Sequence, residues 1–456
     1  MSRARIEVHG KSVWVSRWFR IFHHALAAGV MASAMLGLEH FGLLGWLDAA
    51  MLQMVAPRST ETTQAIPPSI PQLLLIDNEA YAENFGLRSP LQRDSLVTLL
   101  SDALAAKPKT LLIDLQLEPT PDEPDIRMLD HLLSEAAHTG TRIILPLPIP
   151  RTPAQDQRTV TWMRSLCQAG IQFGSASLRT HLGTVVRFDL DRNSMAVLAT
   201  GDMRKEYPAP VSACQLLEKF DSLESLRLLE APEHTSSENA PLKPSAMRSV
   251  IAKSLPWRIQ GARQELQTRK PEIIVIGGDY DDRDTFLTHA QHDPVPGAAV
   301  HAAIIASQGK VNSSHFLGWI ADLFFGCVLG FLFEFLWCKV ARLRSEEMQL
   351  QAPYYRIFLR EWLALLAASG IWLIALLLTL FAMWCSGAMI EGGWWLNPGP
   401  MVLGMFLHAL LLKDAGHTTH PPSAWKEFTL HCPSWPLQLL GSITALTYLV
   451  LHAFRH

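Results

Sequence analysis

Acidic side chains follow three short apolar runs, and they are the residues of this sequence best suited to chemistry. Asp77 and Glu79 come just after the first run, Asp114 ends the second, and Asp279 lies shortly after the third. If the runs are parallel strands, their carboxyl ends share one edge of a sheet, where such folds bind ligands. Carboxylates gathered there can bind a hard cation through oxygen, or a cationic or hydroxylated small molecule.

The loop after the third run adds further polar groups to this candidate site. Asp284 and His289 have the residue types that act as general acid and base in catalysis. An extracytoplasmic hydrolase is therefore one hypothesis, beside the sensor and scaffold hypotheses given below. No nucleophile motif accompanies them, so we predict no catalytic residues. We assign to ligand binding Asp77, Glu79, Asp114, Asp279, Asp284, Thr285 and His289. The competing interpretation is that these acids cap helices and brace loops, and that His301 is a satisfied core histidine.

Strand-like and helix-like segments alternate around these residues. Apolar runs lie at residues 73–76, 110–113, 142–149, 171–176 and 273–276, with helical spacing between most of them. This alternation predicts a mostly parallel α/β sheet with crossover helices. We expect a helix start at Ser89-Pro90, a hairpin-like addition at 184–200, an irregular insertion at 221–268 and a closing helix at about 296–308.

The composition separates the middle of the chain from its flanks. The chain has 456 residues, of which 49% are hydrophobic and only 18% are charged. The charged fraction is below the roughly 25% of an ordinary soluble domain. A net charge of −3 gives no reason to expect nucleic acid as a partner.

Five apolar stretches in the flanks approach the length of about 20 residues that a membrane-spanning helix needs. They lie at residues 21–47, 316–337, 362–384, 394–412 and 435–454, and the last can instead lie in the interface. Lys and Arg concentrate in residues 1–20 and 339–360, which predicts that these segments are cytoplasmic. We therefore predict an extracytoplasmic α/β sensor domain at residues 48–312 plus an α-helical transmembrane bundle. The location would be the bacterial inner membrane, multi-pass, with the central domain in the periplasm and the lipid bilayer as a partner.

The cysteines do not predict a metal site. Six are present, and none has the spacing of a zinc motif. We expect no metal and no cofactor. Cys167 and Cys214 are the two cysteines of the middle region. If that region is extracytoplasmic they can form a disulfide, and the alternative is that each is an ordinary buried cysteine.

The middle region resembles the type-two CHASE family of bacterial sensor domains. The likeness covers roughly residues 45–310 and rests on four stretches. They are LDAAMLQMVAPRS, the LLLIDNEAYAENFG strand with the helix and strand after it, VVRFDLD with EYPAPVSACQLLEKF, and IIVIGGDYDDRDTFLTHAQHDPVPGAAVHAAIIAS. The last stretch is the most specific of the four.

The resemblance implies a sensor of a membrane-anchored signalling protein. Members of the family commonly continue into a cytoplasmic cyclase or kinase, but the segments predicted to be cytoplasmic here are too short for such a domain. We therefore predict a non-enzymatic signal-transduction component without an output domain. It would bind an unknown small ligand, form a homodimer and relay to a separate membrane or cytoplasmic output partner. The alternative is a structural or scaffold subunit of a bacterial envelope assembly, such as a secretion or polysaccharide complex.

Overall fold

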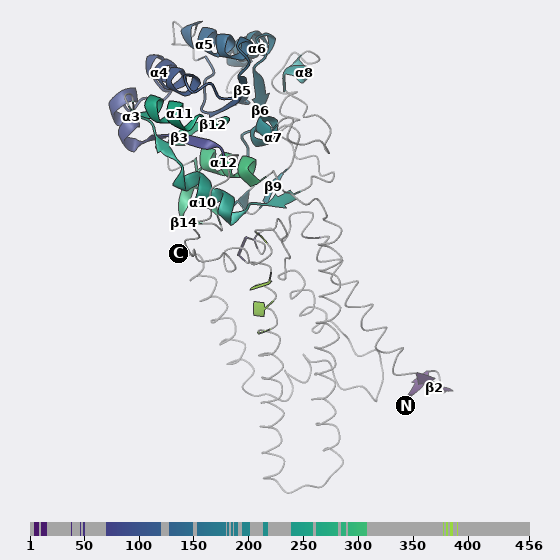
Figure 1. Ribbon diagram of the computed structural model, residues 1–456. Coiled ribbons are helices and arrows are strands. Elements are labelled where there is room, and N and C mark those ends of the chain that lie inside the picture. Colours follow the sequence, from purple (N-terminus) through teal and green to yellow (C-terminus); the bar gives the residue numbers. More distant parts are fainter. Residues whose placement is uncertain are drawn as a thin grey trace. The chain divides into compact units, whose positions relative to one another are not determined.

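The computed structural model divides the chain into two compact units, one of which comprises Ala56–Ser313 with Ile390–Trp394. The residues that it describes are 4–8, 11–15, 70–119, 127–148, 153–178, 180–181, 184–185, 187–189, 194–200, 213–217, 239–258, 261–280, 284–288, 291–307 and ten isolated positions. Most of them belong to the unit that holds the middle region (Figure 1).

A six-stranded sheet forms the centre of this unit, and all its neighbouring strands run parallel. In spatial order the strands are β11 (Leu255–Pro256), β3 (Gln72–Asp77), β12 (Ile273–Asp279), β4 (Thr110–Asp114), β5 (Arg142–Pro146) and β6 (Gln172–Gly174). The central strands are apolar and buried almost throughout, because helices cover both faces of the sheet. The predicted α/β fold with a mostly parallel sheet is confirmed.

Helices cover the two faces of the sheet in separate layers (Figure 1). The first layer contains α3 (Asn78–Phe85), α4 (Arg93–Leu104), α5 (Arg127–His138), α6 (Pro153–Gln168), α8 (Ala213–Leu217) and α11 (Ala262–Arg269). The second contains α7 (Met195–Thr200), α10 (Pro244–Ala252) and α12 (Gly297–Ser307). Side chains alternate along each strand, so Ile274 and Ile276 of β12 face the first layer while Ile273 and Val275 face the second.

Smaller sheets complete the described structure. A four-stranded sheet consists of β14 (Gln291–Pro296), β13 (Thr285–Thr288), β8 (Thr184–Val185) and β7 (Thr180–His181). Two antiparallel pairs are β9 (Arg187–Asp189) with β10 (Asn239–Pro241), and β1 (Ala4–Val8) with β2 (Lys11–Val15). The loop before β13 and the β13–β14 hairpin connect β12 to α12, so they lead the chain back towards the sheet.

Three local predictions differ from the structure. Residues 195–200 form a buried helix rather than part of a hairpin, because most apolar side chains of α7 pack in the second layer under the sheet. The predicted irregular insertion at 221–268 contains α10, β11 and α11. The helix after Ser89-Pro90 begins only at Arg93, and Gln92 precedes it in an extended conformation.

The predicted transmembrane bundle is wrong for the part of the chain that the structure describes. No helix among these residues combines the length and the apolar character that crossing a bilayer requires. The longest described helix, α6, has 16 residues and includes many polar ones, and the apolar helix α12 has 11 and is buried in the protein. The multi-pass, inner-membrane and periplasmic predictions depended on such helices and are corrected with them. The five apolar stretches named above lie outside the described residues apart from isolated positions.

Close contact between α12 and β12 is possible only because of a glycine. A Cβ atom on Gly277 would lie 2.1 Å from the Cβ of Ala298, far inside van der Waals contact. The same Cβ would lie 3.8 Å from the Cβ of Asp114, so Ala298 and Asp114 are neighbours across this glycine. Gly277 therefore sets the separation between α12 and the sheet.

We expect Gly277→Ala to destabilise the fold by about 2 to 3 kcal/mol, because the added methyl group must push α12 away from β12. The measurement is the free energy of unfolding in urea. Gly261→Ala is the matched control, since nothing lies within 4 Å of its added Cβ. Equal stability of the two variants would contradict the close contact.

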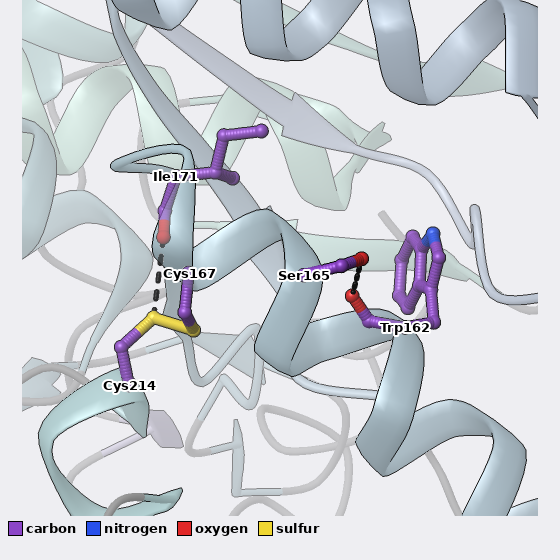
Figure 2. Close-up of a disulfide and its surroundings, with 5 residues drawn as sticks. All are labelled: Trp162, Ser165, Cys167, Ile171 and Cys214. Atoms are coloured by element: carbon purple, nitrogen blue, oxygen red, sulfur yellow. Dashed lines mark hydrogen bonds between the residues drawn. A yellow bond between two sulfur atoms is a disulfide. The ribbon is translucent and has the colours of Figure 1, made fainter.

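A disulfide between Cys167 and Cys214 joins α6 to α8, as Figure 2 shows. The pairing left open by the sequence is thus confirmed. The Sγ of Cys214 lies 3.2 Å from the carbonyl oxygen of Ile171, directly before β6. On the same helix, the indole of Trp162 donates a 2.9 Å hydrogen bond to Asp130 of α5. The disulfide closes a loop with a sequence separation of 47 residues and holds the short helix α8 against the core.

Replacing both cysteines, Cys167→Ser with Cys214→Ser, should lower the free energy of unfolding by about 3 to 4 kcal/mol, because the unfolded chain regains the entropy of a long open loop. Reduction of the wild type should give the same loss in urea unfolding. The control is Cys385→Ser, which removes a free cysteine. A double variant as stable as the control would show that the disulfide does not constrain this unit.

Candidate functional site

The carboxyl edge of the sheet brings together the acids at the ends of β3, β12 and β4. Asp77 and Asp279 are direct neighbours in the register of β3 and β12, and Asp114 is opposite Gly277 on the other side of β12. Asp114 has the same strand parity as Leu112, and Asp279 as Val275, which both pack in the second layer. Strand alternation therefore places Asp114 and Asp279 on the face of the sheet that α12 covers.

Asp77 is held by an arginine that the sequence did not predict to be part of the site. Arg258 donates to both of its carboxylate oxygens, at 2.8 and 2.9 Å, and also pairs with Glu79. Asp77 caps α3 as well, accepting a 2.9 Å hydrogen bond from the amide of Ala80. Burial alone would raise the pKa of Asp77, but the hydrogen bonds and charge of Arg258 outweigh it and hold the pKa below its ordinary value. For Asp77 the helix-capping interpretation is correct.

Arg258 reaches this position through the short edge strand β11. β11 runs parallel to β3, and the amide of Trp257 donates a 2.8 Å hydrogen bond to the carbonyl oxygen of Leu75. The next residue therefore lies beside the end of β3. The sequence carried little signal for this, because β11 is two residues long and lies in a polar stretch.

Asp279 has no such partner. Burial, and after it the negative charge of Asp77, raise the pKa of Asp279 above its ordinary value. Within the described residues, neither a hydrogen bond nor an ion pair reaches its carboxylate. The side chain is exposed at the edge of the sheet.

Asp114 and His301 form a buried pair under the same edge. The Nε2 atom of His301 lies 4.0 Å from a carboxyl oxygen of Asp114 and 3.2 Å from the carbonyl oxygen of Ala176. If Nε2 carries the proton and donates to Ala176, Nδ1 is an acceptor, and that buried atom has no hydrogen-bond partner in the described structure. His301 is 1% exposed, so the core-histidine interpretation holds for its burial and for Nε2, which is bonded to Ala176, but not for Nδ1.

Burial shifts the pKa values of Asp114 and His301 in opposite directions. It raises the pKa of Asp114 to about 7, and no hydrogen bond within the described residues offsets this. Burial lowers the pKa of His301 to about 4, although the bond to Ala176 and the charge of Asp284 act the other way. Near neutral pH the histidine is therefore neutral, and the carboxyl group is close to its midpoint.

The remaining predicted residues lie near the start of α12 or outside the described chain. A carboxyl oxygen of Asp284 is 2.9 Å from the point where a Cβ on Gly297 would lie, so this acid sits at the N-terminus of α12, where negative charge is favourable. Thr285 begins β13 and pairs with Pro296. His289 lies outside the described residues, so its proposed pairing with Asp284 stays a prediction.

Hydrogen-bond acceptors dominate the α12 side of the edge. Asp114, Asp279 and the Nδ1 of His301 all lack a donor within the described residues. No group of three or more His, Cys, Asp or Glu side chains in this part of the chain is arranged to hold a metal ion. The arrangement thus suits a ligand that supplies donors of its own.

Comparison of the chain with protein-family models, with curated proteins and with solved structures found no match. The resemblance to the type-two CHASE family therefore stays a prediction from the sequence.

Asp114→Asn should stabilise the protein at pH 8 by up to about 4 kcal/mol, and much less near pH 5. The reason is that a folded-state pKa of about 7, against 3.8 ordinarily, makes the ionised form costly in the fold. Stability from the protonated acid is present at low pH and is lost as the pH rises through 7. The measurement is urea unfolding at both pH values.

Glu272→Gln is the control for this effect. Glu272 forms an exposed ion pair with Lys109 just before β12, at the opposite edge of the sheet. A gain for Asp114→Asn that is equal at both pH values would contradict a raised pKa. His301 acts in the other direction, because its pKa is lowered from 6.5 to about 4 and its contribution to stability is lost as the pH falls between these values; wild type and variant share this loss.

Proposed function

We propose that the α/β unit is a non-enzymatic sensor domain that binds a small ligand at the carboxyl edge of its sheet and relays its state to a separate output partner. The observation that carries this proposal is the unequal partnering of neighbouring acids. Asp77 is fully paired by Arg258, whereas Asp279 beside it and Asp114 beyond it have no donor among the described residues. Asp279 is exposed to solvent, but Asp114 is buried, and a buried ionised acid without a donor costs free energy that a bound donor group would recover.

The helix α12 is well placed to report occupancy of this edge. It begins where Gly277 permits close contact, carries His301 against Asp114, and packs on α7 and α10. A ligand that reaches Asp114 therefore touches the element that organises the whole second layer. Binding that favours one position of α12 would shift the population of that layer, which is how ligand binding produces a signal.

Binding fits the geometry better than catalysis does. His301 is too deeply buried to exchange protons with a substrate directly, and its low pKa keeps it neutral. The resemblance to the type-two CHASE family supports a sensing role from the sequence side. Homodimerisation is part of the proposal, since symmetric dimers are the commonest oligomers and let two sensor units act together.

The second candidate is a structural subunit that only docks in a larger assembly. Two large apolar side chains favour it, because Leu87 and Met128 are 65% and 61% exposed. A docking subunit would co-purify in a stoichiometric complex and would show no change in α12 with any small ligand.

The sensor proposal predicts that a ligand found by thermal screening slows amide exchange in residues 297–307 by about tenfold. The full-length purified chain would be screened against cationic and hydroxylated compounds, and exchange would be followed by mass spectrometry. The stabilisation follows the ligand concentration relative to its dissociation constant.

Asp279→Asn should abolish the effect, and Glu272→Gln, which removes a carboxylate from the other end of the same strand, should leave it intact. A ligand that raises the melting midpoint without slowing amide exchange in α12 would contradict the sensing role. So would a ligand that slows this exchange equally in both variants.

A further inference from the structure

We propose that the disulfide between Cys167 and Cys214 is a redox switch, which a dithiol reductant opens in the folded protein so that α8 leaves the core while the rest of the α/β unit stays folded. The proposal goes beyond ligand binding at the carboxyl edge and does not depend on it. It rests on the position of the disulfide, on the weak attachment of α8 to the core and on the strong attachment of α6.

The disulfide lies at the periphery of the first-layer core. Cys167 and Cys214 are both partly exposed, and they pack against the buried cluster rather than belonging to it. Figure 2 shows the disulfide between α6 and α8, with the sulfur of Cys214 close to the carbonyl oxygen of Ile171. Reduction begins when a thiolate attacks one of the two sulfur atoms, so a partly exposed disulfide can react without unfolding of the protein.

Apart from the disulfide, α8 has few contacts that attach it to the core. It has five residues, little more than one turn, and an isolated helix of this length is not stable in water. Of its described side chains, Ala213 and Leu217 are buried, whereas Gln215 is exposed. Reduction gives Cys214 a thiol, which is only a weak donor to the carbonyl oxygen of Ile171. Among the described residues, a methyl group, a leucine side chain and a weak hydrogen bond therefore remain to hold α8 once the covalent bond is broken.

The other helix of the pair, α6, is attached to the core independently of the disulfide. It has 16 residues, and Trp162, Met163 and Leu166 are buried in the first-layer core. The indole of Trp162 donates a hydrogen bond to Asp130 of α5, and its ring packs edge-on against Phe173 of β6. Reduction therefore releases α8 and leaves α6 in place.

Release of α8 uncovers the last strand of the six-stranded sheet. α8 packs on α6 and on β6, and β6 ends the spatial order of that sheet beside β5. The contact between Cys214 and Ile171 places α8 against the start of this strand. Ile171 is 1% exposed in the oxidised protein. The oxidised and reduced proteins thus present different surfaces at this edge of the sheet, although the fold is the same.

The reductant is a dithiol, and its exchange with the disulfide is balanced. One thiolate of the reductant attacks a sulfur atom of the disulfide, the S–S bond breaks, a mixed disulfide forms, and the other cysteine leaves as a thiolate that takes up a proton. The second thiol of the reductant loses its proton, attacks the mixed disulfide and forms the reductant's own disulfide, which releases the remaining cysteine. Two electrons and two protons pass from the dithiol to the protein.

The test is reduction of the full-length native protein with dithiothreitol at pH 8 without denaturant. Alkylation with peptide mass spectrometry reports the redox state of Cys167 and Cys214, and amide hydrogen exchange reports the protection of α8 and α4. We expect both cysteines to be reduced and exchange in residues 213–217 to become at least about tenfold faster, while amides of α4 still exchange at least about a hundredfold more slowly than those of an unfolded peptide. Reoxidation with oxidised glutathione should restore slow exchange in α8.

Two variants serve as controls. The double variant Cys167→Ser with Cys214→Ser should show fast exchange in α8 with and without reductant. Cys385→Ser should respond like the wild type, because it removes a cysteine that lies outside the disulfide. Reduction that occurs only in urea would overturn the proposal, since the disulfide would then be inaccessible in the folded protein. Unchanged exchange in α8 after complete reduction would overturn it too, and so would equal loss of protection in α8 and α4, because the disulfide would then stabilise the whole unit rather than hold one helix.

Discussion

The close packing of α12 on β12 is the constraint on which the rest of the site depends. Because Gly277 has no side chain, the first turn of α12 lies directly against the strand at Ala298. That contact fixes the height of the helix relative to the ends of the strands. It places His301, one turn further along, against Asp114, and it leaves the N-terminus of the helix beside Asp284. The contact between α12 and β12 therefore accounts for the burial of Asp114 and for the buried position of the Nδ1 atom of His301.

Within the described residues, the cation of the site comes from the β11 side, which makes the charge distribution along this edge uneven. Arg258 follows β11, which is the outermost strand and pairs with β3 alone. It therefore reaches Asp77 and Glu79 but leaves the β12 and β4 side to a histidine that burial keeps neutral. Arg258 is shared by two acids, Asp77 and Glu79.

The strands and their terminal acids could be predicted from the sequence because buried parallel strands are continuous apolar runs. A shared edge for Asp77, Asp114 and Asp279 follows from parallel pairing in any order. The sequence does not predict that these acids are neighbours, because β12 comes last of these strands in the chain yet lies between β3 and β4. Arg258 escaped prediction because its position depends on a two-residue strand in a polar stretch. The apolar stretches behind the membrane prediction lie outside the described residues apart from isolated positions, and no described helix has the length and apolar character to cross a bilayer.

The pair Gly277-Gly278 shows how one sequence feature serves both faces of the sheet. The pair is not a phosphate-binding loop, because no lysine and no matching glycine spacing follow it. A Cβ on Gly278 would lie 2.5 Å from the ring of Tyr280, which stacks on Tyr81 of α3 at 4.1 Å. Successive residues of a strand face opposite sides, so Gly277 admits α12 on one face and Gly278 admits a tyrosine pair on the other. Because Gly278 has no side chain, the tyrosine pair covers the sheet edge on the α3 side. Because Gly277 has none, α12 packs close to Asp114, and the acceptors without a described donor lie on the α12 side.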